Sequence, residues 1–219
     1  MELLDSIKHQ GQRKKLIQEL NTMGVESKEV LNAMQKVPRH YFLDSSFEDF
    51  AYQNKAFPIG EEQTISHPYT VAFQSEMLDI KKGDKVLEIG TGCGYQTAVL
   101  FHLGANVHSI ERQHALYHKA KVVLTKMRIK AHLHYGDGYL GLPSKAPFDK
   151  IIVTAGAPEI PQELFKQMAL GGLMMIPLGT KEQMMTLIVK TSETEFKKIE
   201  FDNFNQRHFR FVPMLKNKQ

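Results

Sequence analysis

The sequence predicts a three-layer α/β fold with a mostly parallel central sheet and an N-terminal helical cover. The main observation is an apolar strand at 86–89 that runs into Gly90, Gly92 and Gly94 and then into a helical pattern from Ala98. A strand, a glycine turn and a helix in this order open a nucleotide-binding α/β unit. The second observation is that strand-like and helix-like runs alternate after this unit, which is typical of parallel sheets.

The segment before residue 80 is predicted to be mainly helical. Apolar residues at helical spacing indicate a helix over 3–22, which Gly24 ends. Ser27 is an N-cap candidate for a second helix, which Pro38 ends. The next residues, 38–42, are interpreted as a turn with two buried aromatic side chains.

A third helix is expected to begin at Pro68, after an irregular stretch over 44–60. Ser66 or His67 would lie near its cap. This adjacent pair invites comparison with hydrolases, but neighbouring residues rarely meet as nucleophile and base, and the chain has no G-x-S-x-G elbow. The sequence therefore argues against triad chemistry.

The glycines after the first strand have a physical purpose. A residue without Cβ permits positive φ and lets a ligand lie against the backbone. The start of the following helix offers free N–H groups to polar ligand atoms. A glycine-rich turn that binds nothing is the alternative.

The spacing of the glycines discriminates between two cofactor classes. A dinucleotide fingerprint needs G-x-G-x-x-G, but Tyr95 or Thr97 stands at the third position, depending on the starting glycine. The run is instead E-x-G-x-G-x-G, beginning at Glu88. This pattern is that of S-adenosylmethionine-dependent methyltransferases of the Rossmann-like class.

Two acidic residues follow the next two predicted strands. Glu111 ends a strand that starts at Asn106, roughly 20 residues after the first glycine, where a carboxylate can accept both ribose hydroxyls. A helix over 113–127 and a strand over 132–135 precede Asp137, whose loop could receive an adenine amino group. A solvated glutamate and a simple Asp-Gly turn are the alternatives.

A fourth strand, at 148–153, ends in the small uncharged residues of 154–158. Methyltransferases that modify bases carry an N/D-P-P-[YF] motif there, and catechol-type enzymes carry metal-binding carboxylates nearby. The composition instead favours a substrate that needs no strong base and no metal. A helix over 160–168 is expected next, and the remaining strands are expected at 173–179, 185–191, 196–201 and 209–215.

Length and composition fit one cytoplasmic domain over 1–219, divided into a cover at 1–79 and a Rossmann-like core at 80–219. The single cysteine, Cys93, excludes internal disulfides and fits a reducing compartment. No signal peptide and no apolar run of roughly 18 residues is present, so no membrane partner is expected. The net charge of +4 is mild and its basic residues are scattered, so nucleic acid is not expected as a partner either. No long apolar heptad repeat argues for an oligomer.

Several segments of the chain together point to one family. They are VPRHYF, QTISHPYTVA, VLEIGTGCGYQTAVL, the GDG loop, APFDKIIVTAGAPEIPQELFKQMALGGLMMIPLG and FRFVPM. In this order they resemble the protein-L-isoaspartate (D-aspartate) O-methyltransferase family over nearly the whole chain, and the family analogy implies a monomer. The glycine loop alone is typical of any methyltransferase, whereas QTISHP and VTAGAPEIP are specific to this family. Cys93 stands where serine is common and Gly156 where alanine is common, and the tail after Met214 matches least.

The resemblance implies a three-layer Rossmann-like S-adenosylmethionine-dependent methyltransferase fold and a protein repair activity. Asparagine and aspartate in ageing proteins form succinimides, which open largely to isoaspartate. The enzyme methylates the misplaced α-carboxylate, and the ester then re-forms the succinimide. The implied cofactor is S-adenosyl-L-methionine, and the implied partners are isoaspartyl-containing proteins and peptides, with D-aspartyl sites as a further possibility.

The resemblance also implies roles for individual residues. Ser66 is the implied active-site residue, and its hydroxyl would hold the attacking carboxylate by a hydrogen bond. Thr154 and Arg210 are expected on the substrate side, and no metal ligand is expected. The residues implied for cofactor binding are Gln63, Thr64, Ile65, Ser66, Gly90, Thr91, Gly92, Gly94, Glu111, Asp137 and Gly138.

The chemistry of a carboxylate suits these residues. A carboxyl group has a reference pKa near about 3.5 to 4, so it is already a nucleophile at neutral pH. Catalysis then reduces to the alignment of oxygen, methyl and sulfur. The alternatives are a methyltransferase for RNA or a small molecule, a non-catalytic S-adenosylmethionine binder and, more remotely, a nicotinamide dehydrogenase.

Overall fold

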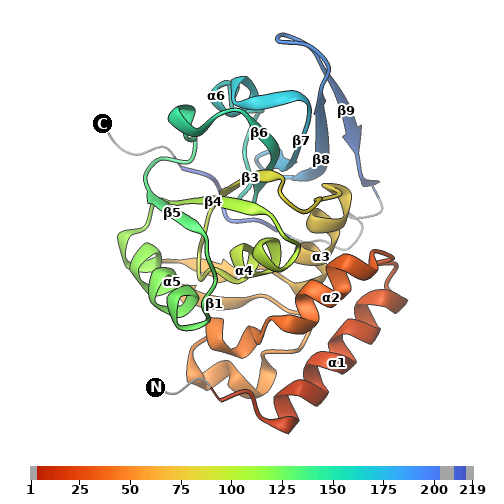
Figure 1. The fold of residues 1–219 in the computed structure, drawn as a ribbon, viewed down its shortest axis with the longest axis vertical. Coiled ribbons are helices and arrows are strands. Elements are labelled where there is room, and N and C mark those ends of the chain that lie inside the picture. The colour runs from red at the N-terminus through yellow and green to blue at the C-terminus, as the bar shows by residue number, and fades with distance from the viewer. Residues whose placement is uncertain (1–3, 203–209, 216–219) are drawn as a thin grey trace.

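A seven-stranded sheet forms the centre of the computed structural model, which describes residues 4–202 and 210–215 (Figure 1). The strand order is β5-β4-β3-β6-β7-β8-β9. Its strands are β3 (Lys85–Ile89), β4 (Asn106–Glu111), β5 (His132–Tyr135), β6 (Phe148–Val153), β7 (Met168–Leu178), β8 (Met184–Lys190) and β9 (Phe196–Glu200).

The strands from β5 to β7 pair in parallel, and β8 and β9 continue the sheet by antiparallel pairing. The predicted mostly parallel sheet is therefore confirmed. In the register of the central strands, Ile89 lies opposite both Ile110 and Val153. The carboxyl ends of β3, β4 and β6 consequently meet at one edge of the sheet.

Helices cover both faces of the sheet, which confirms the three layers. One hydrophobic cluster joins the first five helices to the face that carries Val86, Val107 and Ile152. A second cluster packs α6 against the face that carries Leu87 and Ile151. The helices are α1 (Ile7–Thr22), α2 (Lys28–Lys36), α3 (Pro68–Met77), α4 (Tyr95–His102), α5 (His114–Lys126) and α6 (Gln162–Lys166), and the 3-10 helices are η1 (Arg39–Phe42), η2 (Ser45–Phe50) and η3 (Pro143–Lys145).

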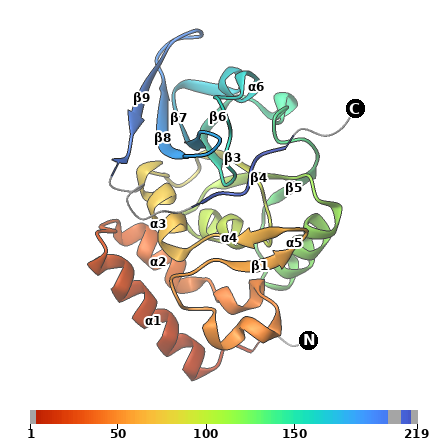
Figure 2. The same ribbon diagram turned by 180° about the vertical axis from the view of Figure 1, so that it is seen from behind.

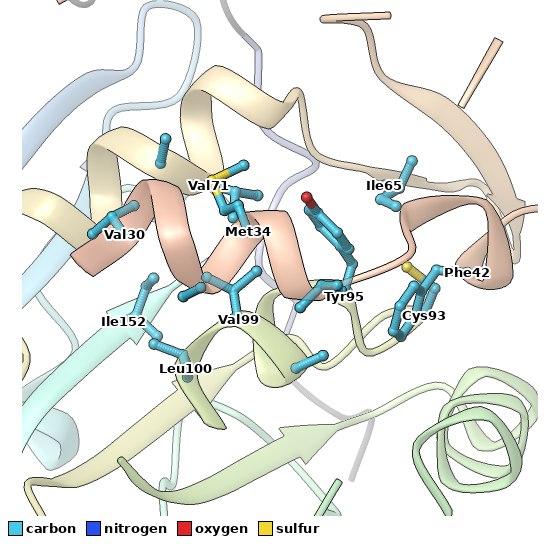
Figure 3. Packing of buried hydrophobic residues seen from close by; sticks show 14 of the residues in the cluster. Val30, Met34, Phe42, Ile65, Val71, Cys93, Tyr95, Val99, Leu100 and Ile152 are labelled. Atoms are coloured by element: carbon cyan, nitrogen blue, oxygen red, sulfur yellow. The ribbon is translucent and has the colours of Figure 1, made fainter. Parts of the chain in front are cut away.

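The N-terminal helices pack directly on the sheet's own helical layer. Val30 and Met34 of α2 lie close to Val99 and Leu100 of α4 (Figure 3). Ser27 caps α2 as predicted, because its Oγ accepts a hydrogen bond from the Val30 amide at 3.2 Å. No helix within residues 4–202 and 210–215 has the length and apolar character that a membrane crossing requires.

Two predictions about strands are wrong. The stretch over 44–60 is not wholly irregular, because β1 (Phe57–Gly60) pairs with β2 (Gln63–Ile65) in a separate antiparallel hairpin. The segment 210–215 forms no strand of the sheet but an isolated bridge between Pro213 and Gly156, and residue 209 lies outside the described residues. The hairpin and this segment lie on the same side of the molecule (Figure 2).

Candidate active site

Two adjoining cavities lie at the carboxyl ends of β3, β4 and β6. The empty volume, which includes space open to solvent, is about 780 Å³ in the first and about 480 Å³ in the second. The cavities share Gln63, Gly90, Glu111 and Ala155 in their walls, so they lie side by side and are together called the cleft. Ligands of open α/β sheets bind at such strand ends.

The glycine loop after β3 forms the floor shared by both cavities. Gly90 has φ +94°, and a Cβ built on it would lie 2.5 Å from the Thr154 Oγ1 atom. That hydroxyl donates to the carbonyls of Ile89 and Gly90, at 2.9 and 2.8 Å. The close approach of the two strand ends therefore requires glycine at position 90.

The other predicted loop residues differ in their access to the cleft. Thr91 and Gly92 line the first cavity. Gly94 lines neither cavity: it is the N-cap of α4, and a Cβ there would approach the Leu124 side chain to 3.1 Å. Gly94 therefore serves helix packing rather than direct contact in this structure.

Glu111 lies at the junction of the two cavities and is 4% exposed. Its carboxylate accepts hydrogen bonds from the backbone amides of Gly92 and Gln113, each at 2.8 Å. These bonds fix the side chain between the glycine loop and the start of α5. A fixed carboxylate facing a cleft is suited to accept hydrogen bonds from hydroxyl groups of a ligand.

Glu88, the first residue of the glycine pattern, is fully buried and lines neither cavity. Burial raises the pKa of Glu88 to about 8. Hydrogen bonds from nearby hydroxyl groups favour the ionised form and oppose this shift, but their effect is smaller. The Thr97 hydroxyl donates to its carboxyl group at 2.5 Å. Glu88 therefore joins β3 to α4 as a largely neutral acid at pH 7.

The segment from β2 to α3 forms the wall opposite the glycine loop. Thr64, Ile65 and Ser66 line the first cavity, and Gln63 lines both. The Ser66 carbonyl accepts a hydrogen bond from the Arg39 Nη2 atom at 2.8 Å. This wall precedes the main sheet in the chain, so the predicted active-site serine comes from residues outside that sheet.

The loop after β5 reaches only the second cavity. Gly138 lines it, and a Cβ on Gly138 would lie 2.5 Å from the Ile89 Cγ2 atom. Asp137 lines neither cavity, and its Oδ1 accepts a hydrogen bond from the Tyr139 amide at 2.8 Å. The backbone of this loop, rather than the Asp137 side chain, faces the cleft.

The C-terminal segment completes both cavities. Arg210, together with Thr154 after β6, lines the first. The segment is held in place by Gly156, whose amide donates to the Val212 carbonyl at 2.9 Å and whose carbonyl accepts from the Met214 amide at 2.7 Å. The two residues predicted on the substrate side therefore face the same cavity as Ser66.

The first cavity offers only weak bases from its His and Cys side chains. Burial, followed by the charge of Arg39, lowers the pKa of His67. Burial raises the pKa of the Cys93 thiol to about 11. The Cys93 thiol is therefore protonated at neutral pH, and the His67 imidazole is a weaker proton acceptor than an ordinary histidine.

Several residues of the cleft were not predicted. Thr70 and Gln96 line the first cavity, and their buried Oγ1 and Oε1 atoms have no hydrogen-bond partner among the described residues. Thr70 lies two residues after the QTISHP segment, and that proximity was a usable signal. The further lining residues are Ala56, Ile59, His67, Val71, Cys93, Tyr95, Phe211 and Val212 in the first cavity, Ile89, Ile110, Arg112, Gln113, Pro213, Met214 and Leu215 in the second, and Ala155 in both.

One group of potential metal ligands among the described residues lies away from the cleft. Asp5, His9 and His40 come together, but none of them lines either cavity. The Asp5 carboxylate is bound by both terminal nitrogens of Arg13, at 3.0 and 2.8 Å. An ion pair already occupies this carboxylate.

Comparison with known proteins identifies the family. The profile of "Protein-L-isoaspartate(D-aspartate) O-methyltransferase (PCMT)" matches residues 11–219. The protein-L-isoaspartate O-methyltransferase of Flavobacterium psychrophilum is 58% identical over 215 residues, covering 98% of this chain and 99% of that relative. The protein of the same name from Salinibacter ruber is 41% identical, over 96% of this chain and 94% of that relative.

Solved structures agree with these sequence relatives. A protein-L-isoaspartate O-methyltransferase structure superposes with a TM-score of 0.81 at 31% identity, covering 94% of this chain and 66% of that one. A Plasmodium falciparum structure, described as a putative protein-L-isoaspartate O-methyltransferase in complex with S-adenosyl-L-homocysteine, has a TM-score of 0.80 at 23% identity, over 94% and 99% of the two chains. The second likeness concerns the fold alone. From its sequence relatives, its matching profile and its fold, the chain belongs to the protein-L-isoaspartate (D-aspartate) O-methyltransferase family of S-adenosylmethionine-dependent repair enzymes.

Proposed function

We propose that the protein transfers the methyl group of S-adenosyl-L-methionine to the free α-carboxylate of L-isoaspartyl residues in damaged proteins and peptides. The observation that carries the proposal is the chemistry of the first cavity. Its histidine is a weakened base and its cysteine is held as a thiol. An acceptor that is already a nucleophile at neutral pH suits this cavity, and an ionised carboxylate is such an acceptor.

The residues of the cleft fit S-adenosylmethionine. The backbone of Gly90 and Gly138 lines the cavities, and the carboxylate of Glu111 lies where the two cavities adjoin. Buried, unpaired oxygen atoms of Thr70 and Gln96 offer further polar contacts. We assign the methionine side to Gly90, Thr91 and Gly92, the ribose to Glu111 and the adenine side to the backbone at Gly138.

The cofactor, when bound, supplies an electrophilic methyl group. The chain's own residues then hold the acceptor. We assign to the Ser66 hydroxyl a hydrogen bond to the attacking carboxylate, with Thr154 and Arg210 on the peptide side of the same cavity. Since no proton has to be removed, the catalytic contribution of these groups is orientation, which is worth up to several orders of magnitude in rate.

We further propose that the enzyme acts as a cytoplasmic monomer with residues 1–79 as the cover of the cleft. The buried single cysteine is compatible with a reducing compartment. The wall formed by Gln63 to Ser66 comes from this cover, whereas the glycine loop comes from the sheet.

The proposal is tested with two synthetic peptides that differ only in carrying isoaspartate or aspartate at one position. Labelled S-adenosylmethionine should transfer its methyl group to the isoaspartyl peptide alone, as a base-labile ester. Equal labelling of both peptides, or a base-stable product, would contradict the assignment. A third arm with total cellular RNA tests the alternative acceptor, and no label should enter it.

A further inference from the structure

Arg39 is a fully buried guanidinium beside the active site that pairs with no carboxylate among the described residues. Its side chain is 0% exposed. None of the ion pairs in residues 4–202 and 210–215 includes it. Burying a charge without an opposite charge is costly, so such a residue is unexpected in a core unless it serves another purpose.

The hydrogen bonds of Arg39 connect two segments of the cover. The Nη2 atom donates to the Ser66 carbonyl at 2.8 Å and to the Lys55 carbonyl at 3.1 Å. These carbonyls lie just before β1 and just after β2, at the open end of the β1–β2 hairpin. A single nitrogen atom therefore holds both strands of the hairpin at the point where Ser66 enters the cavity.

The same guanidinium also lies against a residue at the start of α4. Its Cζ atom lies 4.7 Å from the centre of the Tyr95 ring, and Tyr95 is the first residue of α4, directly after the glycine loop. Figure 3 shows the Tyr95 ring rising from the start of α4 with its hydroxyl directed away from that helix. Buried cation–π contacts of this kind are stabilising, and arginine suits them because its charged group is planar.

Arg39 itself lines neither cavity. It touches Ser66 on one side and Tyr95 on the other, and both of those residues line the first cavity. In the proposed function, Ser66 lies on the side of the cavity that holds the carboxylate acceptor. The start of α4 lies on the side that holds the methyl donor. The distance between these two walls determines whether a carboxylate and a methyl group can meet in line, and small displacements there are costly in rate.

We infer that Arg39 is a positioning residue that sets the separation between the acceptor wall at Ser66 and the donor wall at Tyr95. The inference deepens the proposed function and rests on it. Among the residues that the structure describes, the Nε and Nη1 groups of Arg39 find no hydrogen-bond partner, so the residue is not held by its full set of donors. Its two contacts across the site are the hydrogen bond to the Ser66 carbonyl and the cation–π contact with Tyr95.

The test compares Arg39→Met and Arg39→Lys with the parent enzyme. Methionine has a similar length without the charge, and apolar replacement of a buried ion is often tolerated by the fold. For Arg39→Met, kcat with the isoaspartyl peptide should fall about 10- to 100-fold, the cost of a displacement of about 1 Å. The dissociation constant of S-adenosylmethionine, measured by calorimetry, should change by less than about threefold, since the glycine loop and Glu111 are untouched.

Arg39→Lys keeps a cation over the Tyr95 ring but loses the planar fork, so it should recover part of kcat. The matched control is Arg13→Met. Arg13 is also buried in the cover, but it bonds Asp5, Tyr52 and the Gln35 carbonyl, none of which lines a cavity. That variant should lose stability and keep kcat.

The activity of the parent enzyme distinguishes a failure of the proposed function from a failure of the role assigned to Arg39. A parent that leaves the isoaspartyl peptide unlabelled overturns the proposed function. An active parent with a folded Arg39→Met variant at undiminished kcat overturns the role of Arg39. An equal loss of cofactor affinity and kcat, or an Arg39→Lys variant no better than Arg39→Met, also overturns it, since either result describes a merely structural residue.

Discussion

Ser66 gives the clearest prediction at the scale of a single residue. Ser66→Ala should lower turnover by about 10- to 100-fold, the loss of one hydrogen bond to a charged group. The affinity for S-adenosylmethionine should stay almost unchanged, because the glycine loop and Glu111 remain. Steady-state kinetics with the isoaspartyl peptide and calorimetry with the cofactor measure the two quantities. Ser144→Ala, at an exposed position of η3, is the control, and full activity of Ser66→Ala would remove the serine from the mechanism.

Glu111 should affect cofactor binding instead. Glu111→Ala removes a carboxylate that faces both cavities and accepts two backbone amides. The dissociation constant of S-adenosylmethionine should rise by about tenfold or more, as for the loss of a hydrogen bond to a charged group. Peptide kinetics at saturating cofactor should change much less. An unchanged dissociation constant would contradict the ribose assignment.

Most of the residues that the sequence predicted for the site line the two cavities, and the exceptions have physical reasons. The glycines and Glu111 carry a signal that depends only on local spacing. Arg39 carries none, because arginine is almost never fully buried and its partners at Lys55, Ser66 and Tyr95 are backbone carbonyls and a ring. Asp137 was predicted as a cofactor-side residue because it follows the end of a strand. Whether its side chain or its backbone faces the cleft depends on the conformation of the loop after β5, which the sequence does not give.

At the scale of elements, the glycine loop should tolerate no side chain at its first position. Gly90→Ala places a Cβ 2.5 Å from the Thr154 Oγ1 atom at φ +94°. We expect a loss of stability of about 1–3 kcal/mol and a clear loss of cofactor binding. Urea unfolding and calorimetry measure both. Gly11→Ala, in α1 with no atom within 4 Å of its new Cβ, is the control and should leave binding unchanged.

The elements that the sequence missed are those with unusual turn chemistry. The β1–β2 hairpin turns at Glu61 and Glu62, which have φ of 51° and 56°. Such turns normally use Asn-Gly or Asp-Gly, so two glutamates give no hairpin signal. The strands are short as well, and Pro58 weakens their pattern. The segment 210–215 has a strand-like sequence, but its β-bridge is an isolated one to Gly156. The segment lies in the wall of the cleft and not in the sheet.

At the scale of the whole molecule, Glu88 should make stability depend on pH. Its pKa is about 8 in the folded protein and 4.5 in its ordinary state. The folded state therefore binds the additional proton between these values, and stability falls as the pH rises through that window. The stability that the bound proton on Glu88 gives is fully present below about pH 4.5 and is lost above about pH 8.

Glu88→Gln should remove this dependence, because glutamine stays neutral. Urea unfolding at about pH 5, 7 and 9 should show the variant gaining stability relative to the parent as the pH rises. Glu163→Gln, at an exposed position in α6, controls for a general effect of charge. A difference between variant and parent that is the same at every pH would contradict the raised pKa.

The division of the cleft between two stretches of sequence has an evolutionary consequence. The wall at Gln63 to Ser66 belongs to a two-stranded hairpin outside the main sheet, whereas the glycine loop and Glu111 belong to the sheet itself. In the proposed assignment the Ser66 hydroxyl holds the acceptor, whereas Gly90 and Glu111 hold the donor. Inherited changes at position 66 would therefore act on acceptor recognition through a segment that lies outside the sheet, while the donor contacts of the sheet stay in place.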